Sequence, residues 1–75
     1  MSRNVTLRQL RAFPTVARER SFTRAAAQLH VTQSALTVSI KSLETELGLK
    51  LLDRSTRSVT PTLHGDRFLT LAERM

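Results

Sequence analysis

The 75-residue sequence contains no cysteine, tryptophan or tyrosine, and only two glycines and two prolines. Without cysteine, neither a disulfide nor a thiolate metal site can form. Two glycines are too few for a glycine-rich phosphate-binding loop. Apolar residues run no further than three or four in a row, so the sequence predicts no membrane span and no secretory signal. We therefore expect one small domain with a single modest core, and no membrane as a partner.

Acidic residues are also scarce. Lys and Arg total 12 against six Asp and Glu, which gives a formal net charge of +6 and a pI near 11.6. A surplus of this size favours a polyanionic partner, and arginine, the main contributor, suits phosphate and guanine. The alternative is a domain whose balancing acids lie in another part of a longer protein. The lack of cysteine fits a reducing compartment, and we expect a cytoplasmic location.

The sequence offers little for catalysis. The two histidines, His30 and His64, are predicted in a turn and at a helix start, with no acid at a useful spacing. His30 suits a left-handed turn position better than a ligand role. No metal-ligand spacing occurs. We expect no enzyme activity, no catalytic residue, no bound metal and no cofactor in this chain.

Residues 33–47 are predicted to form a helix with two opposed faces. One face is an apolar stripe at helical spacing, formed by Leu36, Ile40, Leu43 and Leu47. The opposite face is short-chained, polar and basic, and carries Ser34, Thr37, Val38, Lys41 and Thr45. The run TRAAAQLHV just upstream predicts a shorter helix and a tight turn, so the pair predicts a helix-turn-helix that reads DNA. The alternative is an ordinary solvent-facing side of a core helix.

Two further helices and their caps are predicted from the same kind of pattern. From the cap Thr6, an apolar stripe runs to Ala17, with a kink expected at Pro14 and a connection at residues 18–21. Thr23 is the predicted cap of the next helix, with Phe22 packing on Ala27 as a hydrophobic staple. The first stripe comprises Leu7, Leu10, Phe13, Val16 and Ala17, and Thr32 is the predicted cap of the helix over 33–47.

After Gly48, a predicted helix C-cap, two short extended runs at 49–54 and 58–62 predict a β-hairpin wing. The polar turn between them carries Thr56 between Arg54 and Arg57, which suits a phosphate backbone or a minor groove. The alternative is a solvated loop with Asp53 paired to Arg54.

A last helix is predicted to begin after the cap Thr62, with Asp66 near its positive end. Its stripe comprises His64, Phe68, Leu71, Ala72 and Met75. Because the core is expected to close without this helix, the stripe predicts a dimer interface through Phe68, Leu71, Ala72 and Met75. The alternative is that it folds back onto the first helix.

The run SFTRAAAQLHVTQSALTVSIKSLETELGLKLLDRSTRSVTPTLHG resembles the N-terminal domain of LysR-type transcriptional regulators, and the likeness begins at LRQLRAF. The resemblance implies a dimeric bacterial transcription factor that binds double-stranded DNA, with a linker helix that dimerises. It also implies a C-terminal domain that binds a small-molecule inducer and is absent from this chain. This sequence departs from the family pattern at Leu52, Pro14, Pro61 and His64. The predicted DNA contacts are Arg24, Thr32, Gln33, Ser34, Thr37, Val38, Lys41, Arg54, Thr56 and Arg57.

The predicted fold class is therefore all-α, a winged helix-turn-helix with a three-helix core, a two-stranded wing and a C-terminal linker helix. We expect the DNA-binding domain at 1–62, its helix-turn-helix at 22–41, and the start of the linker helix at 63–75. The chain is expected to be a fragment of a longer protein. Two alternatives stay open: a winged-helix protein-interaction module, and a basic amphipathic binder of membrane surfaces.

Overall fold

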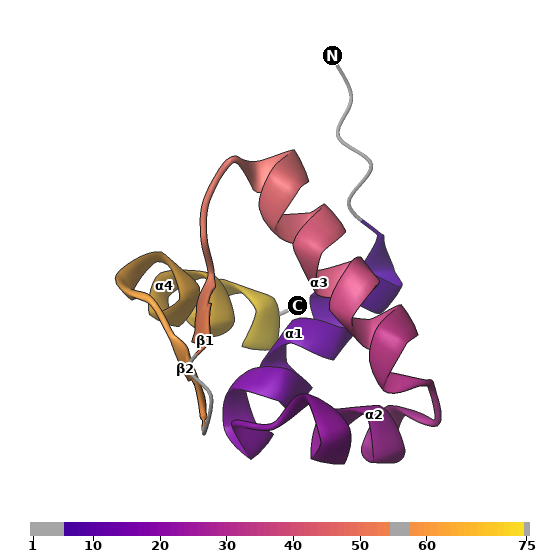
Figure 1. Cartoon of the computed structure of the whole chain (residues 1–75). Coiled ribbons are helices and arrows are strands. Elements are labelled where there is room, and N and C mark those ends of the chain that lie inside the picture. The colour runs from indigo at the N-terminus through magenta and orange to yellow at the C-terminus, as the bar shows by residue number, and fades with distance from the viewer. Residues whose placement is uncertain (1–5, 55–57, 75) are drawn as a thin grey trace.

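The computed structural model describes residues 6–54 and 58–74. In chain order the elements are α1 (Leu7–Glu19), α2 (Phe22–Leu29), α3 (Gln33–Leu47), β1 (Leu52–Arg54), β2 (Val59–Pro61) and α4 (Leu63–Glu73). In Figure 1 the hairpin and α4 lie at one side of the molecule, and the turn between α2 and α3 lies at the other. This arrangement confirms the predicted winged helix-turn-helix.

Local capping chemistry places the ends of the helices. Thr6 caps α1 and forms a reciprocal capping box with Gln9, while Thr32 accepts a hydrogen bond from the Ala35 N–H at the start of α3. Gly48 ends α3 at φ 67°, a left-handed conformation in which glycine has no side-chain clash. The predictions for Thr6, Thr32 and Gly48 are confirmed.

Two non-glycine residues also adopt the left-handed conformation and end helices. His30 at φ 58° ends α2 and turns the chain into α3, as the sequence predicts. Arg20 at φ 54° ends α1, which runs through Glu19, so the predicted connection at 18–21 is wrong. The connection is only two residues long, because Ser21 caps α2.

The predicted cap Thr23 and the staple from Phe22 to Ala27 are also wrong. Ser21 accepts from the Arg24 N–H, and Phe22 is the first residue of α2, buried in the core. Ala27 is exposed and so gives Phe22 no partner. Serine is the stronger N-cap of the two, and a helix that begins at Phe22 also buries the Phe22 ring, so both effects favour Ser21 over Thr23 as the cap.

The core lies where α1, α2 and α3 meet the first strand. Its largest fully buried side chains are Phe13, Val16, Ile40, Leu43, Leu51 and Leu52. Pro14 is buried within a continuous α1. Leu7, predicted in the α1 stripe, is 58% exposed, because it begins the helix beyond the edge of the core. Gln9 is buried instead, and its Nε2 donates to the Ser39 carbonyl across to α3.

The wing is a short antiparallel hairpin in which Leu52 pairs with Pro61 and Arg54 with Val59. It confirms the predicted strands, although both are shorter than the extended runs. Each three-residue strand places one apolar side chain in the core, Leu52 from β1 and Val59 from β2, and this burial holds the hairpin on the domain. The turn residues 55–57 lie outside the described residues.

The last helix is attached to the domain at its start and along one side. The Thr62 N–H donates to the Leu51 carbonyl at 2.9 Å, and its hydroxyl caps α4 at the Gly65 N–H. A Cβ at Gly65 would overlap the Leu51 carbonyl oxygen, so only glycine permits this approach. Phe68 packs edge-on against Phe13 with ring centroids 5.6 Å apart. The expectation that the core closes without α4 is therefore wrong.

Candidate nucleic-acid interface

The outer face of α3 lies open, as the sequence predicts. Leu36, Ile40 and Leu43 are buried on the inner side. On the outer side Thr37 is half-buried, and the exposed residues are Gln33, Ser34, Val38, Lys41 and Thr45. Between Gln33 and Leu43 the helix carries no acidic residue. This surface, which we call the α3 outer face, presents hydroxyls, an amide and one ammonium to solvent.

The side chain of Gln33 is held by a contact that the sequence does not reveal. The Thr23 hydroxyl donates to Gln33 Oε1 at 3.1 Å. With its oxygen engaged, the amide presents its Nε2 group as the donor for an acceptor such as guanine N7 or O6. Thr23 was predicted as a helix cap, and its actual contact spans ten residues of sequence, so no local pattern marks it.

Arg54 at the end of β1 stacks on an aromatic ring of α2. Its guanidinium carbon lies 4.4 Å from the centroid of Phe22, at the distance of a cation–π contact. No ion pair joins Asp53 to Arg54, two residues that the structure describes, so the alternative of a paired, solvated loop is not supported. Phe22 thus fixes the direction of a wing cation relative to the helix-turn-helix.

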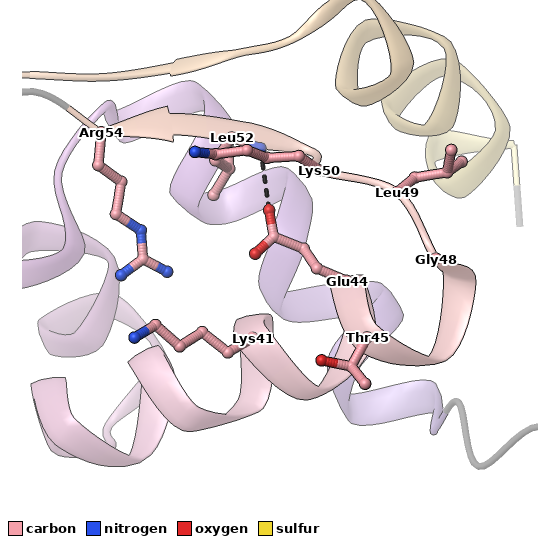
Figure 2. Close-up of a pocket in the computed structure, with 8 residues that line it drawn as sticks. All are labelled: Lys41, Glu44, Thr45, Gly48, Leu49, Lys50, Leu52 and Arg54. Atoms are coloured by element: carbon pink, nitrogen blue, oxygen red, sulfur yellow. Dashed lines mark hydrogen bonds between the residues drawn. The ribbon is translucent and has the colours of Figure 1, made fainter.

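Glu44 fixes the wing from the other side, through the backbone. Its Oε2 accepts from the N–H groups of Leu51 and Leu52, at 2.8 and 3.1 Å. Figure 2 shows the bond from Leu52. Both leucines are fully buried, so these N–H groups have little access to water and need an internal acceptor. Glu44 thus joins α3 to β1, and no local sequence pattern marks this contact.

A depression lined by cations lies between α3 and β1, next to the Phe22–Arg54 stack and the Glu44 hydrogen bonds. Figure 2 shows the side chains of Lys41 and Arg54 extending into it from opposite elements. Lys50 also lines it, while the Glu44 carboxylate is turned to the backbone of β1. Three positive groups around one engaged carboxylate suit a bound anion such as a phosphate.

The remaining predicted contacts fall into two groups. Arg24 and Thr32 are exposed at α2 and at the start of α3, next to the outer face. Thr56 and Arg57 lie outside the described residues, as does Met75 of the predicted dimer stripe. None of the ten predicted DNA contacts is tested by the geometry alone, and they stay predictions.

The residues of the predicted dimer stripe on α4 differ in how exposed they are. Phe68 and Ala72 are half-buried, and Phe68 already contacts Phe13 within the chain. Leu71 is 56% exposed and Leu63 is 66% exposed. At the far end of α4, the Glu73 carboxylate oxygen Oε2 lies 3.6 Å from the Arg18 guanidinium nitrogen Nη1 of α1. Both side chains are exposed, so this ion pair contributes little to stability.

Comparison with known proteins identifies the domain. Residues 7–66 match the family model of bacterial regulatory helix-turn-helix proteins of the lysR family. The chain belongs to this family. The match spans α1 through the first turn of α4, and so includes the helix-turn-helix, the wing and the Thr62–Gly65 attachment.

Curated relatives are transcriptional regulators. The chain is 55% identical to the regulator PgrR of Escherichia coli over 62 residues, which are 83% of this chain and 21% of PgrR. It is 48% identical to the regulator CfxR of Cupriavidus necator over 73 residues, which are 97% of this chain and 23% of CfxR. The chain therefore spans about a fifth of the length of these relatives.

Solved structures share the fold closely. The DNA-binding domain of BenM in complex with catB site 1 DNA superposes with a TM-score of 0.89 at 43% identity, over 92% of this chain and 77% of that one. Full-length CbnR in complex with its target DNA gives 0.89 at 40% identity, over 92% of this chain and 24% of that one. Within the described ranges 6–54 and 58–74, none of the helices has the length and apolar character needed to cross a membrane.

Proposed function

We propose that this domain binds double-stranded DNA sequence-specifically and thereby regulates transcription in the bacterial cytoplasm, by binding and not by catalysis. In this proposal the N-terminal half of α3 enters the major groove and the wing contacts the backbone or the minor groove. The observation that carries it is the α3 outer face, which is largely exposed, contains no acid, carries Lys41 and has Arg54 of the wing beside it. The BenM and CbnR complexes with DNA support it, because they share this fold.

Within this arrangement the residues have distinct roles. Gln33, Ser34, Thr37, Val38 and Lys41 are proposed to face base edges, and Arg24, Thr32, Arg54, Thr56 and Arg57 to hold the backbone or a narrow minor groove. Base contacts provide sequence discrimination and phosphate contacts provide affinity and register. The Thr23 bond to Gln33 and the Phe22 stack under Arg54 support this division, since each holds one of these groups in place before DNA arrives.

We also propose a homodimer through α4, so that two α3 helices meet one face of the duplex. The exposed Leu63 and Leu71 support a protein partner on this helix. The division into residues 1–62 and a linker helix from 63 belongs to this proposal. Inducer binding is assigned to a C-terminal domain outside this chain.

The test is a titration of the 75-residue chain against three targets: a duplex enriched from a random library, a scrambled duplex, and vesicles containing an anionic phospholipid. We expect the enriched duplex to bind at least about five-fold tighter than the scrambled one, the lower bound for one good base contact. Affinity for both duplexes should fall with salt. Tighter binding to the vesicles than to either duplex would point to a membrane-surface binder, equal binding to all three targets would contradict sequence-specific recognition, and binding to none of them would point to a protein-interaction module.

A further inference from the structure

Val38 is the most exposed large apolar side chain in the described part of the molecule, at 67%. Counting about 100° per residue, it lies about 170° from the mean direction of the three buried side chains of α3. It therefore occupies the point of the helix furthest from the core. No packing among residues 6–54 and 58–74 accounts for a valine there.

The helix itself gives no reason for this valine either. Valine is β-branched and has a lower helix propensity than most polar residues suited to a helix surface. Its exposed neighbours one turn away are the polar Ser34, Lys41 and Ser42 and the small Ala35. A single large apolar side chain at the centre of a polar face is best explained by the partner that this face binds.

The major groove of DNA contains one apolar group on its base edges, the C5 methyl of thymine. We propose that Val38 contacts a thymine methyl, and so specifies thymine at one base pair for each α3 helix bound. The inference rests on the proposed function and deepens it. A helix face with no acid and with Lys41 beside the valine can approach the polyanion closely enough for this contact.

A different use of Val38 is docking of a protein. Val38 borders a depression between α3 and the start of α1, where Leu7 and Val31 are also exposed. The rim of this depression carries Arg8 and Arg11. Such a basic rim disfavours a second copy of this strongly basic chain. Leu7, 58% exposed and on α1, is therefore the matched control for a protein contact.

The experiment begins with a duplex enriched from a random library by the 75-residue chain. Each thymine in turn is replaced by deoxyuridine, which removes the C5 methyl and leaves the pairing hydrogen bonds unchanged. Affinities are measured by fluorescence anisotropy for the wild type, Val38→Ala and Leu7→Ala. We expect one thymine per half-site whose replacement weakens wild-type binding about four-fold, the factor for returning one methyl-sized group to water.

In Val38→Ala this sensitivity should disappear, while Leu7→Ala should retain it. The folded state is checked by thermal melting, which an exposed position should leave unchanged. The inference is overturned if every thymine replacement affects wild type and Val38→Ala alike. It is also overturned if Val38→Ala and Leu7→Ala both alter self-association and leave DNA binding intact. If no duplex is enriched at all, the proposed function itself fails, which is a distinct result.

Discussion

The helices α3 and α4 each have one side packed on the domain and one side exposed, but their exposed sides differ in chemistry. Exposed positions of α3 carry hydroxyls, an amide, Lys41, the small Ala35 and a single large apolar side chain, Val38. Exposed positions of α4 include Leu63 and Leu71 among charged residues. A polar, acid-free surface suits a polyanion, whereas exposed leucines retain apolar area that a protein partner can bury.

The inner sides differ as well. Three side chains of α3 are buried at its core-facing side, so this helix is an integral part of the core. In α4 only Gly65 is buried, and Phe68 and Leu69 are half-buried against the core. The helix that we propose to meet DNA is thus held rigidly, while α4 lies at the periphery and is attached along one side. Rigid support is what base readout requires.

The largest expected effect tests this attachment of α4. Phe68→Ala should lower the free energy of unfolding by about 3 kcal/mol, the low end for loss of a packed phenylalanine, because it removes the ring that packs on Phe13 and uncovers that part of the core. Leu71→Ala, at an exposed position of the same helix, should change it by less than about 0.5 kcal/mol. Urea denaturation of both variants measures the difference. An equal loss of stability in Phe68→Ala and Leu71→Ala would contradict the distinction between a packed and an exposed side of α4.

The second effect concerns the carboxylate that joins α3 to the wing. Glu44→Ala should cost about 2–3 kcal/mol of stability, because the N–H groups of Leu51 and Leu52 lose their acceptor in a buried setting. Glu44→Gln keeps a carbonyl oxygen at the same place and should recover at least half of the loss. Urea denaturation with both variants is the measurement. If Glu44→Gln is as damaging as Glu44→Ala, the backbone contact is not the source of the effect.

What the sequence predicts well is local. Threonine and glycine caps act within four residues, and helical periodicity needs only one segment, so Thr6, Thr32, Gly48 and Thr62 were predicted where the structure has them. The outer face of α3 followed from the same periodicity. These features depend on backbone geometry that any sequence shares.

What the sequence does not predict is set by contacts between distant segments. Phe22 and Arg54 are 32 positions apart, and Phe13 and Phe68 are 55 apart. Whether Phe22 begins a helix or precedes its cap depends on which choice buries the ring, and that depends on the wing and the core. The α3 pattern and the resemblance to the LysR family led to the predicted DNA contacts, which stay predictions, but no local pattern indicated what holds Gln33 or Arg54 in position.

The third effect tests the readout proposed for α3. Gln33→Ala should cost about 1–3 kcal/mol on an enriched duplex and almost nothing on a scrambled one. Thr45→Ala, further along the same exposed side, is the matched control and should affect both duplexes equally. Thr23→Val removes the hydroxyl that holds Gln33 and should reduce the preference between duplexes, with little change in affinity for the scrambled one. Fluorescence anisotropy measures the affinities of the three variants for both duplexes. Equal losses on both duplexes for Gln33→Ala would show that this residue does not read sequence.

The fourth effect concerns the cation on the wing. Arg54→Ala should weaken binding to all duplexes and lower the slope of log affinity against log salt by about one unit, the amount for one phosphate contact. Arg67→Ala removes an exposed arginine of α4 and should leave the slope unchanged. The salt titration is done on the scrambled duplex, where base contacts contribute least. An unchanged slope in Arg54→Ala would exclude this residue as a backbone contact.

The smallest expected effect is the self-association of α4. Its exposed side offers Leu63 and Leu71, each worth roughly 1.5–3 kcal/mol when fully buried, whereas association costs an estimated 4–15 kcal/mol of lost freedom. Two such leucines from each copy together give about 6–12 kcal/mol. Where the association cost lies near the lower end of its range, the surplus is about 4–5 kcal/mol, so the 75-residue chain should dimerise only at high micromolar concentration or above. Sedimentation equilibrium should detect this dimer in the wild type and not in Leu71→Asp. Because Leu71 is exposed in the single chain, thermal melting of dilute Leu71→Asp should match the wild type. Unfolding of Leu71→Asp would place Leu71 in the core and contradict the interface, as would a wild type that stays monomeric at millimolar concentration.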